Sequence, residues 1–233
     1  MAERHIVALG GGGIADADGP LARYLFDLTG AARPRVCFVP TATGDAAQWV
    51  ALFYRTLPAR RFEPTDLRLF DRSGADIREQ LLSANAVYVA GGNTANMLAI
   101  WRLHGVDAIL REAWEAGVVL FGGSAGGLCW FEGGITDSFG PGLAPLRDGL
   151  GFLSGTFCPH YDGEALRRPT YQRLVAEGFP PGYAADDAAG LHFIGTDLSE
   201  AIAEREGSGV YAVALGDGGG AIETPLACRL LSG

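Results

Sequence analysis

Short apolar runs alternate, over the first half of the chain, with longer segments in which apolar residues recur at helical spacing. The runs are typical of strands buried on both faces of a parallel sheet, and they cover residues 6–9, 35–39, 67–70, 86–90 and 118–121. The segments between them predict helices over residues 20–30, 46–57, 76–83, 95–103 and 106–116. This alternation predicts an α/β fold with a doubly wound, mostly parallel sheet and helices on both of its faces.

The pattern changes after residue 130. Gly and Pro become frequent over residues 130–159 and the helical spacing disappears, which predicts loops and short strands forming a small antiparallel flank. A last helix is expected over residues 169–178, and the remaining tail alternates short strands with turns. Because no linker, repeat or low-complexity tract divides the chain, we expect a single domain over residues 1–233.

Composition narrows the class of protein. Hydrophobic residues make up 48% of the chain and charged residues 19%, as in a globular protein with an ample core. The net charge of −9 argues against a nucleic-acid partner. No apolar run approaches the roughly 18 residues that would span a bilayer, and the N-terminus carries no apolar signal segment, so we expect a cytoplasmic protein without a membrane partner. The four cysteines lack metal-ligand spacing, so we expect no metal. We also expect no organic cofactor. A homodimer is one assembly open to the chain.

Three glycine-rich loops follow predicted strands, at residues 10–13, 91–94 and 122–127. In parallel sheets the ligand lies beyond the carboxyl ends of the strands, so these loops indicate where a site would form. The first loop also has the spacing of a dinucleotide-binding fingerprint. That interpretation requires an acidic residue at the tip of the second strand, and the strand instead ends in Pro40 and Thr41.

The third loop carries the most specific motif of the chain. Gly122, Ser124 and Gly126 form a Gly-x-Ser-x-Gly pattern directly after an apolar strand, which is typical of a nucleophile elbow. The amide of Ala125, which follows the serine, would be available to bind an oxyanion. The alternative is a glycine-rich turn whose serine only caps a helix.

A serine nucleophile requires a base and, usually, a carboxylate that orients the base. Of the four histidines, His160 is the best candidate because it lies in a loop that leaves an apolar segment. Asp137 and Asp187 are the two candidate carboxylates, both in loops after short apolar segments, where Asp is also favoured simply as a turn residue.

The chain resembles the peptidase E group of serine dipeptidases, which includes aspartyl dipeptidases and, more distantly, cyanophycinases. The resemblance covers most of the chain and rests on the order and spacing of several landmarks. These are the glycine-rich first turn, Pro40-Thr41-Ala42, Gly91-Gly92-Asn93-Thr94 with Leu98, Gly123-Ser124-Ala125-Gly126, and Pro159-His160-Tyr161.

The resemblance implies a fold similar to that of class I glutamine amidotransferases, with Ser124 as the nucleophile and His160 as the general base. It implies that the amides of Gly92 and Ala125 form the oxyanion hole. It leaves the acid open between Asp137 and Asp187, with a slight preference for Asp187. The adjoining residues Asn93 and Thr94 would contact the substrate.

The same resemblance implies a serine exopeptidase that hydrolyses short peptides, as a dipeptidase favouring an N-terminal Asp. A cation would then have to pair with the substrate carboxylate, and Arg167 and Arg168 follow His160 closely in the sequence. The alternative for these arginines is a solvated helix face. The alternative function is a non-catalytic or differently specialised small-molecule-binding member of the amidotransferase-like fold.

Overall fold

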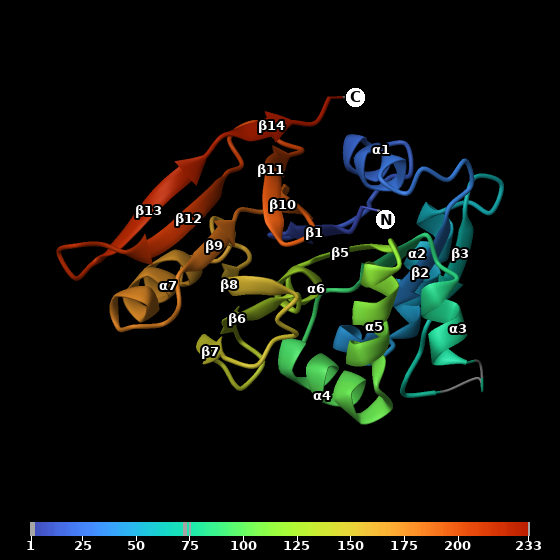
Figure 1. Ribbon diagram of the computed structural model, residues 1–233, viewed down its shortest axis with the longest axis horizontal. Helices are drawn as coiled ribbons and strands as arrows, with labels where there is room; N and C mark the ends of the chain where they lie inside the picture. Colours follow the sequence, from blue (N-terminus) through green and yellow to red (C-terminus); the bar gives the residue numbers. More distant parts are fainter. Residues whose placement is uncertain (1–2, 72–73, 75, 233) are drawn as a thin grey trace.

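The computed structural model describes residues 3–71, 74 and 76–232, and within these ranges the strands form two sheets (Figure 1). The larger sheet has eight strands in the order β14-β11-β10-β1-β5-β4-β2-β3. From β1 to the edge strand β3 the neighbours are parallel, namely β1 (His5–Leu9), β5 (Val119–Gly123), β4 (Ala86–Val89), β2 (Arg35–Val39) and β3 (Glu63–Asp66). Beyond β1 the sheet continues antiparallel through β10 (Ala189–Ile194) and β11 (Asp197–Ala203), and β14 (Cys228–Leu230) closes that edge.

Helices cover both faces of this sheet because alternate residues of each strand point to opposite faces. In β1, Ile6 packs into a core with helices α3 (Ile77–Leu82), α4 (Thr94–His104) and α5 (Val106–Glu115). Val7 packs on the other face, with α1 (Pro20–Asp27) and α2 (Ala47–Thr56). The predicted α/β class with helices on both faces is confirmed.

One edge strand was predicted in the wrong place. The apolar residues 67–70 were expected to pair, but the strand is β3, which precedes them and carries the sequence Glu-Pro-Thr-Asp. The side chains of Leu67 and Leu69 are nevertheless buried, at 3% and 5% exposure. The alternating apolar residues Leu67 and Leu69 are therefore buried in the core without forming a strand. The strand β3 forms through backbone hydrogen bonds to β2, and its side chains carry no apolar pattern that would predict it.

The flank is larger than expected. It is a six-stranded sheet in the order β13-β12-β9-β8-β6-β7, and β6, β8 and β9 run parallel rather than antiparallel. Its strands are β6 (Phe131–Thr136), β7 (Ala144–Leu146), β8 (Leu153–Cys158), β9 (Gly182–Ala185), β12 (Val210–Leu215) and β13 (Ala221–Leu226). Helix α7 (Arg167–Ala176) packs on it, and the hairpin of β12 and β13 extends away from the larger sheet (Figure 1).

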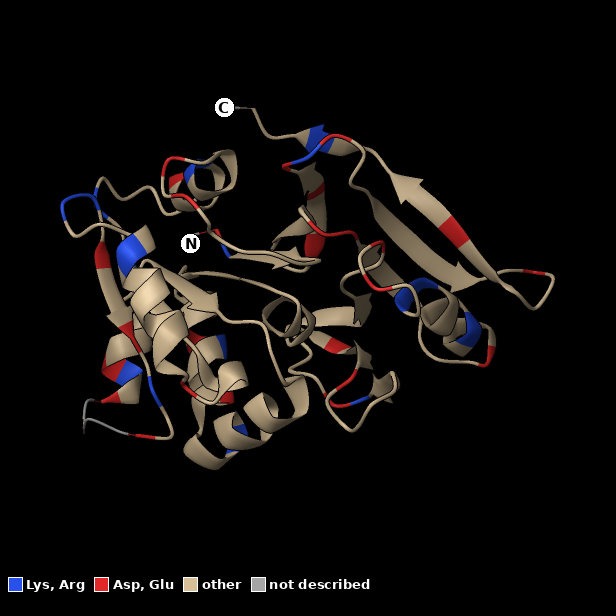
Figure 2. Cartoon of the chain, turned by 180° about the vertical axis from the view of Figure 1, so that it is seen from behind, with Lys and Arg blue, Asp and Glu red and all other residues tan. Residues whose placement is uncertain are grey.

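Charged residues do not gather on one element. Arginines are interspersed with acidic residues over loops, helices and strands (Figure 2). None of the helices in the described ranges is both long and apolar enough to cross a bilayer.

Candidate active site

Ser124 lies at the end of β5, on a turn into the short helix α6 (Ala125–Leu128), and its backbone has φ 56° and ψ −118°. A serine rarely adopts positive φ, so the surrounding structure must hold this strained conformation. The Ser124 amide donates to the carbonyl of Leu9 at 3.1 Å, and its own carbonyl accepts from the amides of Gly127 and Leu128. The elbow is therefore fixed on both sides of the serine.

The glycines of the elbow are required by close packing. A Cβ on Gly122 would lie 2.5 Å from the carbonyl oxygen of Val89, and one on Gly126 would lie 2.3 Å from the same oxygen. A Cβ on Gly123 would lie 2.3 Å from the carbonyl oxygen of Gly12. The turn thus fits between the ends of β4 and β1 only without side chains at these positions.

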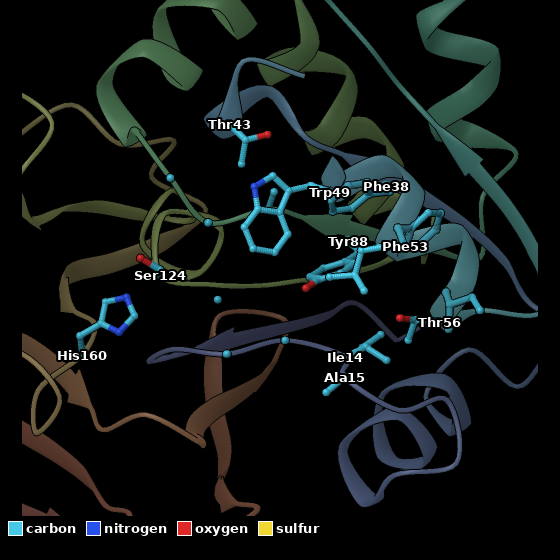
Figure 3. Close-up of a pocket in the computed structure, with 18 residues that line it drawn as sticks. Ile14, Ala15, Phe38, Thr43, Trp49, Phe53, Thr56, Tyr88, Ser124 and His160 are labelled. Carbon is cyan, nitrogen blue, oxygen red and sulfur yellow. The ribbon is translucent and has the colours of Figure 1, made fainter. Parts of the chain in front are cut away.

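His160 and Asp187 form a hydrogen-bonded pair. His160 Nδ1 lies 2.7 Å from Asp187 Oδ1. An ionised carboxylate only accepts, so Nδ1 is the donor, and in the neutral imidazole Nε2 then carries the free lone pair. Figure 3 shows the imidazole of His160 beside Ser124, and both residues line the same pocket. The structure thus brings together Ser124, His160 and Asp187.

Several contacts hold this pair in place. The His160 amide donates to the carbonyl of Gly10 at 3.1 Å, and the Asp187 amide donates to Asp162 Oδ1 at 2.8 Å. Gly11 lies directly against the pair, since a Cβ there would be 1.8 Å from Asp187 Oδ1 and 2.6 Å from His160 Nδ1. Sequence reasoning did not identify Gly11 or Asp162, although Asp162 follows His160 by two positions.

Asp137 does not contact His160. The side chain of Asp137 is 64% exposed. Among the described residues it forms an ion pair with Arg167, in which Arg167 Nη2 lies 4.0 Å from Asp137 Oδ1. Of the two candidate carboxylates, the structure brings only Asp187 to the histidine. Asp186, which precedes Asp187, is buried and accepts a hydrogen bond from the Gly209 amide at 2.8 Å. Its carboxylate therefore binds the segment that leads into the smaller sheet.

The amides of Gly92 and Ala125 lie at the ends of β4 and β5. Ala125 is the first residue of α6, and the first amides of a helix have no acceptor within it. Gly92 has φ 137°, and a Cβ there would lie 2.3 Å from the carbonyl oxygen of Ala42, so this position requires glycine. Among the described residues, neither amide donates to a backbone carbonyl in a loop or cap.

Asn93 and Thr94, predicted to contact substrate, instead begin α4. Asn93 caps the helix by accepting from the Asn96 amide at 2.8 Å and donates through Nδ2 to the carbonyl of Ser138. Thr94 is 2% exposed, and its amide donates to Ser138 Oγ at 2.9 Å. Neither residue lines the pocket at Ser124.

Arg167 and Arg168 are both engaged by protein groups and do not line that pocket. Arg167 is 3% exposed, and its guanidinium donates to Glu164 at 2.7 Å and to the carbonyl of Ile135 at 2.9 Å. Arg168 pairs through two nitrogens with the carboxylate of Glu223. The structure therefore does not bring either predicted substrate-binding arginine to the site.

The pocket beside Ser124 has a volume of about 580 Å³ and lies between the ends of β1, β2, β4 and β5 and helix α2. Aromatic and aliphatic side chains form most of its wall: Phe38, Trp49, Leu52, Phe53, Leu57 and Tyr88 (Figure 3). Within the described part of the chain, His160 is the one lining residue with an ionisable side chain other than the Tyr88 phenol. Burial raises the pKa of that phenol, which therefore stays neutral near pH 7.

The described residues include no cluster of three or more His, Cys, Asp or Glu side chains arranged to hold a metal ion. The four cysteines are free thiols, and Cys37, Cys129 and Cys158 are buried.

Comparison with known proteins defines the class. Residues 6–201 match the model of the family described as Peptidase family S51. The chain is 44% identical over 217 residues to "Uncharacterized peptidase YgaJ" of Bacillus subtilis (strain 168), which covers 92% of this chain and 94% of the relative. This chain therefore belongs to peptidase family S51, and it is a peptidase, a hydrolase.

Solved structures agree on the fold. A putative peptidase E protein from Listeria monocytogenes EGD-e superimposes with a TM-score of 0.61 at 19% identity, covering 84% of this chain and 97% of that one. A peptidase from an acI-B1 Actinobacterium superimposes with a TM-score of 0.69 at 18% identity, covering 97% and 95%. The resemblance to the peptidase E group is confirmed, and the amidotransferase-like fold is consistent with these structures.

Proposed function

We propose that this peptidase is a serine exopeptidase that hydrolyses short peptides, as a dipeptidase, through Ser124, His160 and Asp187. The observation that carries the proposal is the 2.7 Å hydrogen bond between His160 and Asp187 in the pocket that the strained Ser124 also lines. Asp187 would orient the imidazole and stabilise its positive charge, while Nε2 would remove the proton from the serine hydroxyl.

In this mechanism Ser124 Oγ attacks the scissile carbonyl, and the amides of Gly92 and Ala125 donate to the oxygen that becomes negative. His160 then gives its proton to the departing amine, which leaves an acyl-enzyme on Ser124. A water molecule, activated by the same imidazole, hydrolyses the ester and frees the serine.

The proposal does not include a preference for N-terminal Asp. The resemblance implied that preference through Arg167 or Arg168, but protein carboxylates already engage both guanidinium groups. An arginine held in a bidentate pair would have to break that pair before it could bind a substrate carboxylate.

The test is hydrolysis of dipeptides by the wild-type protein and by matched variants. Ser124→Ala and His160→Ala should lose several orders of magnitude in kcat, because loss of a triad member costs roughly 10⁴-fold or more in serine hydrolases. Asp187→Asn should lose about 10⁴-fold, whereas Asp137→Asn should stay within a few-fold of wild type. If Ser124→Ala kept near wild-type rates, the serine mechanism would be wrong.

The non-catalytic alternative is not retained, because the chain belongs to a peptidase family.

A further inference from the structure

The apolar pocket beside Ser124 is open in the free protein. Trp49 and Leu52 belong to α2, yet their exposed fractions are 47% and 39%. On the same helix, Val50 and Phe53 are buried in the core. The apolar side of α2 is thus wider than the core covers, and the excess faces the site (Figure 3).

Three rings of the pocket wall, those of Phe38, Phe53 and Tyr88, pack on other aromatic rings. Phe38 and Phe53 stack with centroids 4.9 Å apart and planes 15° apart. Tyr88 stacks on Phe121 beneath it, also at 4.9 Å and with planes 12° apart. A ring or a branched chain entering the pocket would meet a preformed surface, which reduces the entropic cost of binding.

The proposed reaction decides which half of the substrate lies against this wall. The departing amine must be beside His160, because the imidazole gives it a proton. Figure 3 shows His160 on one side of Ser124 and the rings of Trp49 and Tyr88 on the other. The acyl half of the substrate, which stays bound to Ser124, therefore directs its side chain toward the aromatic wall.

The chemistry of the wall favours an apolar side chain in that place. A buried carboxylate without a cation is strongly disfavoured, and among the described residues no arginine lines the pocket. Apart from Ser124 and His160, the polar groups on the described side chains that line it are the hydroxyls of Thr43, Thr56 and Tyr88 and the indole N–H of Trp49, which carry no charge near pH 7. An aromatic side chain, in contrast, would cover roughly 150–250 Å² of apolar surface.

We propose that the surface formed by Phe38, Trp49, Leu52, Phe53 and Tyr88 is the subsite for a large apolar side chain on the residue whose carbonyl is attacked. The enzyme then cleaves after residues such as Phe, Tyr, Leu or Met and discriminates against Asp. This inference rests on the proposed role of Ser124 as the nucleophile.

The experiment uses diphenyl 1-aminoalkylphosphonates, in which a serine displaces phenol from phosphorus and becomes covalently labelled. Three probes differ only in the side chain: benzyl, methyl and carboxymethyl. Adducts on Ser124 are counted by mass spectrometry against time, with Ser124→Ala as the blank. The benzyl probe should label Ser124 roughly 10- to 150-fold faster than the methyl probe, because burying a large apolar side chain is worth that factor, and faster still than the carboxymethyl probe.

Two variants connect the preference to the wall. Trp49→Ala should lower the benzyl-to-methyl ratio, and Leu52→Arg should raise the carboxymethyl rate relative to benzyl. Both positions are partly exposed, so neither change should prevent folding. Leu103→Ala is the control, since Leu103 is 74% exposed on α4 and does not line the pocket.

The outcomes separate the two proposals. Faster labelling of Ser124 by the carboxymethyl probe, or ratios that stay unchanged in both Trp49→Ala and Leu52→Arg, overturns the apolar subsite and leaves the serine mechanism standing. If no probe labels Ser124, the nucleophile itself is wrong and the subsite assignment falls with it.

Discussion

Gly11→Ala is the most specific perturbation that the site offers. The substitution adds one methyl group outside the reacting atoms, at a position whose φ does not lie in the left-handed region. The new Cβ would lie 1.8 Å from Asp187 Oδ1 and 2.6 Å from His160 Nδ1. It would therefore push directly on the hydrogen bond that orients the imidazole.

The size of the effect follows from these distances. To reach an ordinary van der Waals separation of 3.4 Å, the Asp187 oxygen would have to move by about 1.6 Å relative to the methyl group. The backbone cannot relieve much of this, because the Gly10 amide and carbonyl bond to Ala189 and His160. A misplacement of about 1 Å lowers the rate about 10²-fold, and loss of the acid lowers it about 10⁴-fold. The kcat/KM of Gly11→Ala should therefore decrease by a factor between these two values.

The assay compares kcat/KM and thermal stability of Gly11→Ala with those of Gly142→Ala. Gly142 also lies outside the left-handed region, and a Cβ there would have no neighbour within 4 Å, so this control should keep both activity and stability. If Gly11→Ala retained more than about a tenth of the wild-type kcat/KM, the His160–Asp187 pair would not limit catalysis in the way that the geometry implies.

Three further predictions concern charge and metal. Arg168→Met should leave the ratio of benzyl to carboxymethyl labelling unchanged. It should lower the melting temperature by only a few degrees, because the ion pair of Arg168 with Glu223 is worth about 1 kcal/mol at a partly exposed site. A changed labelling ratio would show that Arg168 does contribute to substrate binding. Burial lowers the pKa of His192 to about 4, with His5, Tyr24 and Glu200 around its ring, so the unfolded chain binds a proton near pH 6.5 that the folded one does not. This contribution to the free energy of unfolding is therefore fully present above pH 6.5 and should decrease by up to about 3 kcal/mol as the pH falls to about 4. Urea titrations of wild type and His192→Gln over this pH range would measure the decrease, and an equal dependence of the unfolding free energy on pH in the two proteins would contradict the prediction. EDTA should leave peptide hydrolysis unchanged, since the proposed nucleophile and base are side chains, and recovery of a lost rate by zinc or manganese would contradict the mechanism.

The sequence was sufficient where local pattern and burial coincide. The apolar run before Gly122 has to be a buried strand, and the glycines after it permit a single tight turn, so the elbow at Ser124 could be predicted from local chemistry. The faces of α4 and α5 followed in the same way from helical spacing. Element boundaries differed by one to three residues, as at α7, which begins at Arg167 rather than at Pro169, and at α1, which ends at Asp27 rather than at residue 30.

Features that depend on distant partners could not be predicted. Arg168 is close to His160 in the sequence, but Glu223, which lies 55 positions later, holds its guanidinium away from the site. The choice between Asp137 and Asp187 likewise depends on which loop returns to His160, and only the pairing of the Asp187 loop with Gly11 makes that clear. The apolar wall was missed because Trp49 and Leu52 have the spacing of core residues, and spacing does not reveal that the core ends before them.

The rate of fluorophosphonate labelling tests the central claim, that His160 and Asp187 activate Ser124, most directly. Intact-mass measurements on wild type, Asp187→Asn and Asp137→Asn would follow one adduct with time, and peptide mapping would locate it. We expect a single adduct on Ser124, formed at the wild-type rate in Asp137→Asn and slowed by orders of magnitude in Asp187→Asn. An adduct on another residue, or equal rates in the two aspartate variants, would contradict it.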